Sequence, residues 1–205
     1  MMKAAFFDVD GTLLSGKSLI GFAQFLQTYT TIQIPTLPMF LQKLKTMFQQ
    51  DIPRSEMNRY YFSIFKGQSE QAVDAAGREW FIKEKTNPGF YVNSSLDKLR
   101  FFREKNYRIV FVSGSFMPIL SHLACEVGGA DVLCSRPEII HGKYTGELCG
   151  SPCIGEAKKT RVLQYALDHH VNLSECWGFG DDDSDIPMLE AVGNCVKIIT
   201  GGGHA

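Results

Sequence analysis

The chain has 205 residues, of which 44% are hydrophobic and 21% charged, an ordinary globular composition that allows one domain with a large insertion or two small domains. A formal net charge of −1 gives nucleic acid no general electrostatic attraction, and no run of roughly 18 apolar residues suggests stable insertion into a membrane. The first residues already form a candidate strand, which leaves no room for a signal peptide, so we interpret the six cysteines as reduced thiols of a cytoplasmic protein.

Apolar runs and helical periodicity alternate along most of the chain. Strands are predicted, in chain order, over Lys3–Phe7, Arg108–Val112, Asp131–Cys134, Cys176–Phe179 and Cys195–Ile199, and helices over Asn93–Lys105, Phe116–Val127 and Gly155–His170. Glu138–Leu148 alternates around a glycine and predicts a β-hairpin at the side of the sheet. Strands that alternate with helices indicate an α/β fold with a doubly wound parallel sheet.

Residues 16–90 break this alternation, because they contain no confident strand and have the pattern of several helices. The segment directly follows the first strand, so we expect an inserted helical cap over the sheet edge, with residues 1–15 and 91–205 forming the catalytic core. A helical extension with a packing role alone is the alternative. Within the segment, Leu37–Phe48 is expected to form an amphipathic helix whose apolar face packs inward.

Aspartates follow two of the predicted strands. Asp8 and Asp10 come after the first strand, and Asp181 and Asp185 come after Cys176–Phe179. Parallel strands end at the same edge of a sheet, where ligands of open α/β folds bind, so these carboxylates should converge. Converging carboxylates repel one another, and oxygen ligands without nearby cysteine or histidine favour Mg²⁺ over zinc. A Ca²⁺ loop is the alternative, but the glycine and distant glutamate of an EF-hand are missing.

The residue types suggest separate roles. Asp8 can bind the metal with one oxygen and attack phosphorus with the other, which would form an aspartyl-phosphate. Asp10 can protonate the leaving oxygen and later activate water, and it is a candidate metal ligand beside Asp8 and Asp181. Gly11 permits a sharp turn, and Thr12 can support the ligands by a local hydrogen bond.

Two further segments offer phosphate-binding groups. Ser113 and Gly114 end a predicted strand and precede a helix, so a hydroxyl and free backbone N–H groups form a candidate phosphate cradle. Lys158 and Lys159 point about 100° apart on a helix, so only one is expected to neutralise phosphoryl charge. Asp185 can bond metal-bound water or Lys158.

These segments, in this order, resemble the haloacid dehalogenase-like (HAD) superfamily, in its phosphoserine-phosphatase-like branch (subfamily IB). Phe7–Leu14 matches the first family motif, Ser113 the second, Lys158 the third, and Gly180–Asp185 the fourth. The resemblance covers nearly the whole chain and implies a Rossmann-like core, Mg²⁺ dependence and phosphoester hydrolysis through Asp8. It also favours Lys158 over Lys159, and Asp10 separates the chain from the superfamily's dehalogenases and transport ATPases.

One position departs from true phosphoserine phosphatases, which carry a glutamate that pairs with the substrate ammonium group. This chain has Lys17 there, nine residues after Asp8, which inverts the charge. The cap arginine that would hold the serine carboxylate has no secure match, because Arg54 is only nearby and Arg59 is offset by about two residues, roughly 200° on a helix. Lys17 and Arg59 are therefore candidate specificity residues, and L-phosphoserine is expected to be a poor substrate.

We expect a Mg²⁺-dependent phosphomonoester phosphatase that acts on a small phosphorylated metabolite through an aspartyl-phosphate. A phosphomutase of the same superfamily, which would return the phosphoryl group to a second hydroxyl, is the nearest alternative. A phospho-accepting receiver-like signalling protein also surrounds an aspartate with acids and a lysine, but its aspartate follows a middle strand and it lacks so long an insertion. Nucleic acid is not an expected partner, and a homodimer is left open.

Overall fold

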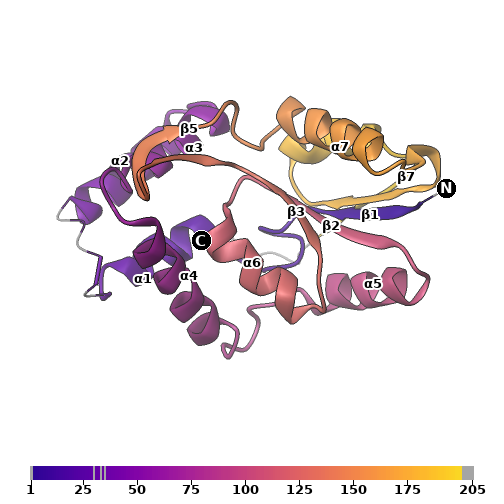
Figure 1. Ribbon diagram of the computed structural model, residues 1–205, viewed down its shortest axis with the longest axis horizontal. Coiled ribbons are helices and arrows are strands. Elements are labelled where there is room, and N and C mark those ends of the chain that lie inside the picture. The colour runs from indigo at the N-terminus through magenta and orange to yellow at the C-terminus, as the bar shows by residue number, and fades with distance from the viewer. Residues whose placement is uncertain (1, 30, 33, 35, 200–205) are drawn as a thin grey trace.

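The fold centres on a five-stranded parallel sheet in the order β3-β2-β1-β6-β7 (Figure 1). The computed structural model describes residues 2–29, 31–32, 34 and 36–199. The strands are β1 Ala4–Phe7, β2 Arg108–Ser113, β3 Asp131–Cys134, β6 Trp177–Gly180 and β7 Asn194–Lys197. Each predicted strand is present within two residues at either end, and the expected doubly wound, Rossmann-like α/β fold is confirmed.

Side chains of the central strands alternate between two separate apolar cores, because successive residues of a strand point to opposite faces. Phe7 stacks on Phe179 at a ring-centroid distance of 4.4 Å on one face, whereas Phe6 packs against Tyr165 on the other. The first face is covered by α5 Asn93–Glu104, α6 Met117–Glu126 and the helices between β1 and β2. The second face is covered by α7 Glu156–Asp168 and α8 Ile186–Glu190.

The segment between β1 and α5 is helical, as the sequence predicts. It contains α1 Ser18–Leu26, α2 Leu37–Gln49, α3 Arg54–Ser63 and α4 Glu70–Glu84, and its described residues form no strand longer than an isolated bridge. We call residues 16–90 the helical insertion. It packs on the core through aromatic rings: Phe22 and Phe62 lie 6.0 and 5.2 Å from Phe116, which immediately precedes α6.

The predicted hairpin forms a separate two-stranded sheet, β4 Pro137–Ile140 and β5 Lys143–Leu148. It lies against the helical insertion rather than at the side of the main sheet, alongside α3 in Figure 1. The Gly67 N–H donates to the Tyr144 oxygen at 2.8 Å, and the Tyr144 N–H donates to the Gln68 oxygen at 3.0 Å. The Tyr144 ring also packs on Phe65 at 5.9 Å, so backbone pairing and aromatic burial both hold the hairpin there.

Two short 3₁₀ helices complete the described chain, η1 Leu173–Glu175 before β6 and η2 Asp183–Asp185 after it. Among the residues that the structure describes, no helix has the length and apolar character needed to cross a membrane.

Candidate active site

The predicted site residues lie at the carboxyl edge of the sheet, where three adjacent strands end. Asp8 follows β1, Asp181 follows β6, and Ser113 is the last residue of β2. The strand register aligns Phe7 with both Phe111 and Phe179, so the following residues leave the sheet at the same level. Residues more than 160 positions apart in sequence therefore meet at one edge, as ligand sites of open parallel sheets do.

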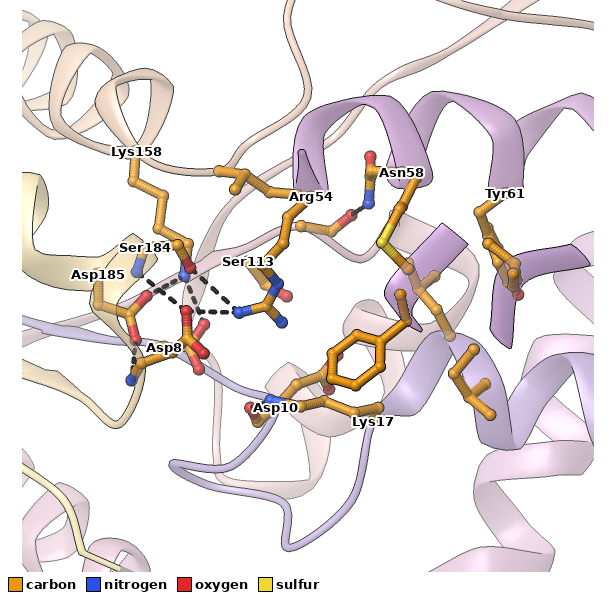
Figure 2. Close-up of a pocket in the computed structure, with 18 of the residues that line it drawn as sticks. Asp8, Asp10, Lys17, Arg54, Asn58, Tyr61, Ser113, Lys158, Ser184 and Asp185 are labelled. Atoms are coloured by element: carbon orange, nitrogen blue, oxygen red, sulfur yellow. Dashed lines mark hydrogen bonds and ion pairs between the residues drawn. The ribbon is translucent and has the colours of Figure 1, made fainter. Parts of the chain in front are cut away.

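Lys158 lies between two of these carboxylates (Figure 2). Its Nζ is 2.5 Å from Asp8 Oδ1 and 2.6 Å from Asp185 Oδ1, and the residue is only 3% exposed. Burial lowers the pKa of Lys158, but the carboxylates of Asp8 and Asp185 raise it by more, so the net shift is upward. The lysine therefore stays charged and offers a fixed positive group beside Asp8.

Asp185 has both carboxylate oxygens occupied. Oδ1 accepts from Lys158, while Oδ2 accepts from the backbone N–H groups of Asp181 and Asp182, each at 3.1 Å. The side chain is 1% exposed, and its burial raises its pKa, with Asp8 adding to the rise. Asp185 thus holds Lys158 and the backbone of Asp181 and Asp182 in place.

Asp10 points to a different partner from the other acids. Its two carboxylate oxygens accept from the Ser18 N–H and the Ser18 hydroxyl, each at 3.0 Å. Burial, followed by the nearby Asp8 charge, raises the pKa of Asp10 to about 6. A carboxyl group with that pKa can both give and take a proton near neutral pH, which is the property a general acid–base group needs.

The acid cluster has the chemistry of a hard-cation site. Oxygens of Asp8, Asp181 and Asp185 lie within 4.8 Å of one another, and Thr12 Oγ1 donates to Asp181 Oδ1 at 3.1 Å. Three carboxylates without a cysteine or histidine ligand suit Mg²⁺ better than zinc. The sequence suggested Asp8, Asp10 and Asp181 as metal ligands. In the structure the third clustered carboxylate is that of Asp185, because the Asp10 carboxylate is turned toward Ser18.

Gly11 is what lets the loop pass so close to the acids. Its φ is +105°, a conformation that other residues rarely adopt, and a Cβ at this position would overlap the Asp181 carboxylate. Gly11 therefore permits both the turn after Asp10 and the close contact between this loop and Asp181, which follows β6.

Ser113 and Gly114 lie beside Asp8 on the same cavity. The Ser113 hydroxyl accepts from the Ser115 N–H at 3.1 Å, while Asn58 Nδ2 from α3 donates to the Gly114 oxygen at 2.8 Å. Asn58 Oδ1 in turn accepts from Ser135 Oγ at 3.2 Å. The helical insertion is thereby hydrogen-bonded directly to the candidate phosphate loop.

The two candidate specificity residues have different surroundings. Lys17 lines the cavity but faces the acids: its Nζ donates to the Asp10 main-chain oxygen at 2.8 Å and lies 3.9 Å from Asp181 Oδ2. Arg59 is exposed and is not among the cavity-lining residues. Arg54 lines the cavity instead and pairs with Asp182 Oδ1 at 2.5 Å.

A cavity of about 490 Å³ lies between the sheet edge and the helical insertion. Figure 2 shows Asp8, Lys158 and Asp185 at one end and Tyr61 of α3 at the other, with Asp10 and Lys17 near the floor between them. Candidate catalytic residues and residues of the helical insertion thus line one cavity.

Three features of the candidate site were not predicted from the sequence: the contacts of Ser18, the contacts of Asn58, and the position of Arg54 on the cavity. Ser18 begins α1 and Asn58 is buried in α3, so both had the pattern of ordinary helix residues. The local signals in the sequence were weak: Ser18 is a small hydroxyl residue at the start of a helix, and Asn58 is a polar residue on the buried face of one.

The class of protein follows from these groups together. They define a hydrolase of the phosphatase class, with a candidate aspartate nucleophile, a buried lysine, a candidate phosphate-binding loop with a hydroxyl group, and an acid cluster suited to a metal, all at the edge of a parallel sheet. Residues 5–190 match the family model described as haloacid dehalogenase-like hydrolase. The chain therefore belongs to that family, and its phosphoserine-phosphatase-like character, expected from the motifs, is confirmed.

Similar proteins agree with this assignment. A probable phosphatase of Mycobacterium tuberculosis is 26% identical over 93% of this chain and 67% of its own length. A phosphoserine phosphatase of the same organism is 26% identical over 97% of this chain and 65% of its own length. The chain thus spans about two thirds of the length of these relatives.

Solved structures share the fold at lower identity. A Bordetella pertussis protein of unknown function superposes with a TM-score of 0.83 at 22% identity, covering 96% of this chain and 90% of its own. A substrate-bound phosphoserine phosphatase gives a TM-score of 0.68 at 18% identity, covering 95% of this chain and 85% of its own. The inserted helical layer is therefore part of a fold that other proteins share.

Proposed function

We propose that the protein is a Mg²⁺-dependent phosphomonoesterase that hydrolyses a small phosphorylated metabolite through an aspartyl-phosphate on Asp8. The observation that carries the proposal is the contact of Lys158 Nζ with both Asp8 and Asp185, next to Asp10, whose pKa is about 6. This combination supplies an aligned nucleophile, a fixed positive charge and a proton donor on one cavity.

The metal-binding groups follow from the contacts. The Asp185 carboxylate accepts three hydrogen bonds, from Lys158 and two backbone N–H groups, so we propose the less heavily bonded carboxylates of Asp8 and Asp181 as the ones that hold Mg²⁺. The Asp10 main-chain oxygen faces the same side as Asp181, since the Lys17 ammonium contacts both groups, and we assign it as the Asp10 ligand. Bound Mg²⁺ would supply positive charge against the phosphoryl oxygens.

The proposed reaction has two balanced steps. First, an Asp8 oxygen forms a bond to phosphorus while the phosphorus–alkoxide bond breaks, and Asp10 gives its proton to the departing oxygen. Then water attacks the phosphorus, Asp10 takes a proton from that water, and the Asp8–phosphorus bond breaks to release inorganic phosphate. Lys158, Ser113 and the Gly114 backbone would hold the phosphoryl oxygens throughout.

The proposal also covers the domain organisation and the location of the protein. We propose that residues 16–90 act as a cap domain on a core of residues 1–15 and 91–205, because insertion residues share the catalytic cavity. The cytoplasm is the proposed location, supported by six cysteines that are all free thiols. A phosphomutase would need the same groups and is distinguished by its product.

The test is to measure phosphate release across phospho-amino acids, sugar phosphates, nucleotides and simple esters, and to trap the phosphoenzyme. The Asp8→Asn variant should lose turnover and the hydroxylamine-sensitive phosphoenzyme, whereas Asp97→Asn, at an exposed carboxylate on α5, should retain both. An isomerised phosphate ester without release of phosphate would indicate the mutase. Normal turnover by Asp8→Asn would exclude the covalent route.

A further inference from the structure

Hydrocarbon side chains make up most of the cavity lining that comes from α1, α2 and α3, and Gln24 and Lys45 lie among them. The apolar residues of this lining, which we call the apolar wall, are Leu19, Ile20, Leu41, Leu44, Phe48 and Met57. Leu44 faces inward and is buried, while Phe48 lines the cavity and is 72% exposed. Apolar surface that faces an open cavity is stabilised when an apolar ligand covers it.

The charged side chains by which the helical insertion lines the cavity are cationic, namely Lys17, Lys45 and Arg54, so a substrate ammonium group finds no carboxylate among them. The carboxylates that line the cavity in the described part of the chain are Asp8, Asp10, Asp182 and Asp185. All belong to the catalytic edge and have partners: Lys158 for Asp8 and Asp185, Ser18 for Asp10, and Arg54 for Asp182. A substrate ammonium group would therefore meet no unpaired carboxylate on the insertion side.

Polar side chains of the insertion also line the cavity, among them Lys17, Gln24, Lys45 and Asn58. Asn58 is already bonded to Gly114 and Ser135, and Lys17 to Asp10. A sugar hydroxyl placed against the apolar wall would lose its water without gaining a partner, which is unfavourable. A polyol or a phospho-amino acid would therefore leave the apolar residues of the lining uncovered, whereas a hydrocarbon chain would cover them.

The size of the cavity exceeds what a phosphate group needs. At roughly 30 Å³ for each water-sized group, about 490 Å³ holds a phosphate and roughly ten further non-hydrogen atoms. That space is continuous from Asp8 to the apolar residues of α2, so one molecule can reach both.

From the lining, the paired charges and the volume, we infer that the natural substrate is a phosphate monoester of an alcohol with a hydrocarbon chain. The phosphate lies at Asp8 and the chain extends along Leu41, Leu44 and Phe48. This inference rests on the proposed function and adds the class of leaving group. It does not depend on Lys17 as a specificity residue, because the Lys17 ammonium is directed at Asp10 and Asp181.

The first experiment is a chain-length series. We would measure kcat/KM for ethyl, butyl, hexyl and octyl phosphate, with L-phosphoserine and glycerol phosphate for comparison. Each buried methylene should raise kcat/KM by roughly fourfold until the wall is covered, so octyl phosphate should exceed ethyl phosphate by at least about a hundredfold. A flat series, or a preference for L-phosphoserine or glycerol phosphate, would overturn the inference.

A matched pair of variants on α2 tests the location of the chain. Phe48 is 72% exposed and lines the cavity, whereas Met39 is 76% exposed on the same helix and does not. Phe48→Ser should lower the octyl-to-ethyl ratio of kcat/KM by about fivefold or more, and Met39→Ser should leave that ratio unchanged. Equal effects of the two substitutions would show that the preference for octyl phosphate comes from general surface hydrophobicity. That result would contradict binding of the hydrocarbon chain along α2.

A binding measurement separates this inference from the proposed function. Octylphosphonate and methylphosphonate, which cannot be hydrolysed, would be titrated calorimetrically into the wild-type protein with Mg²⁺. Tighter binding of octylphosphonate without hydrolysis of any ester would support the apolar site and contradict the phosphatase. Hydrolysis of short esters with equal affinity for both phosphonates would support the phosphatase and contradict the apolar site.

Discussion

The Lys17 ammonium donates a hydrogen bond to the main-chain oxygen of Asp10 at 2.8 Å and lies 3.9 Å from Asp181 Oδ2. A positive charge thus lies between two of the groups proposed to hold Mg²⁺. Lysine and Mg²⁺ favour the same oxygens, so the lysine should compete with the metal unless it swings away.

Removing the Lys17 charge should tighten Mg²⁺ binding. We expect Lys17→Met to bind Mg²⁺ roughly five- to tenfold more tightly at low salt, with a smaller gain at high salt because the lysine is partly exposed. Isothermal titration calorimetry of the free protein measures this directly. Lys45→Met, at an exposed lysine on the cavity rim, is the control, and weaker or unchanged binding in Lys17→Met would show that Lys17 does not compete.

Removing Lys158 should destabilise the metal-free protein. Lys158→Met leaves Asp8 and Asp185 buried without their shared cation, and breaking a buried ion pair from one side costs about 3–5 kcal/mol. Adding Asp185→Asn should recover part of that loss. Urea denaturation with chelator measures the free energy of unfolding, and Lys159→Met should stay within about 0.5 kcal/mol of wild type. If the losses in free energy of unfolding simply add in the double variant, Lys158 and Asp185 are not energetically coupled.

The stability of the metal-free protein should depend on the protonation of Asp10. Its pKa rises from 3.8 to about 6 on folding, chiefly through burial, so folding favours the neutral carboxyl. The contribution to stability is complete below pH 3.8 and is lost as the pH rises through about 6. Asp10→Asn, always neutral, should therefore stabilise the chelated protein more at pH 8 than at pH 5, by about 1–2 kcal/mol. A difference of the opposite sign between the two pH values would rule out this account.

Metal dependence should appear in both stability and activity. Mg²⁺ should raise the melting temperature and restore turnover after treatment with EDTA, because the cation relieves repulsion between Asp8 and Asp181. Ca²⁺ should stabilise without restoring turnover, since its looser, higher coordination can engage both Asp8 oxygens. Asp181→Asn should lose most of the Mg²⁺-induced shift in melting temperature. Turnover that survives exhaustive chelation would remove the metal from the mechanism.

Local sequence patterns were sufficient for the catalytic edge. Asp8 and Asp181 directly follow apolar strands and Ser113 ends one, and the rule that parallel strands finish at one edge was enough to expect them together. Those expectations depend only on chain order, strand direction and residue chemistry. Lys158 is different: Lys158 and Lys159 both lie in the first turns of one helix, and only the resemblance to the HAD superfamily favoured Lys158.

Only the tertiary structure determined which residues surround the carboxyl edge of the sheet. The bond of Ser18 to Asp10, the bond of Asn58 to Gly114 and the docking of β5 on the helical insertion all join segments that no periodicity relates. Whether Lys17 faces a substrate or the acids depends on the rotation of α1 and the path of the loop before it. Packing of whole elements sets such rotations, through many weak contacts whose sum no short stretch of sequence contains. The apolar face of α2 was evident from its pattern, but only the folded chain turned part of it toward Asp8.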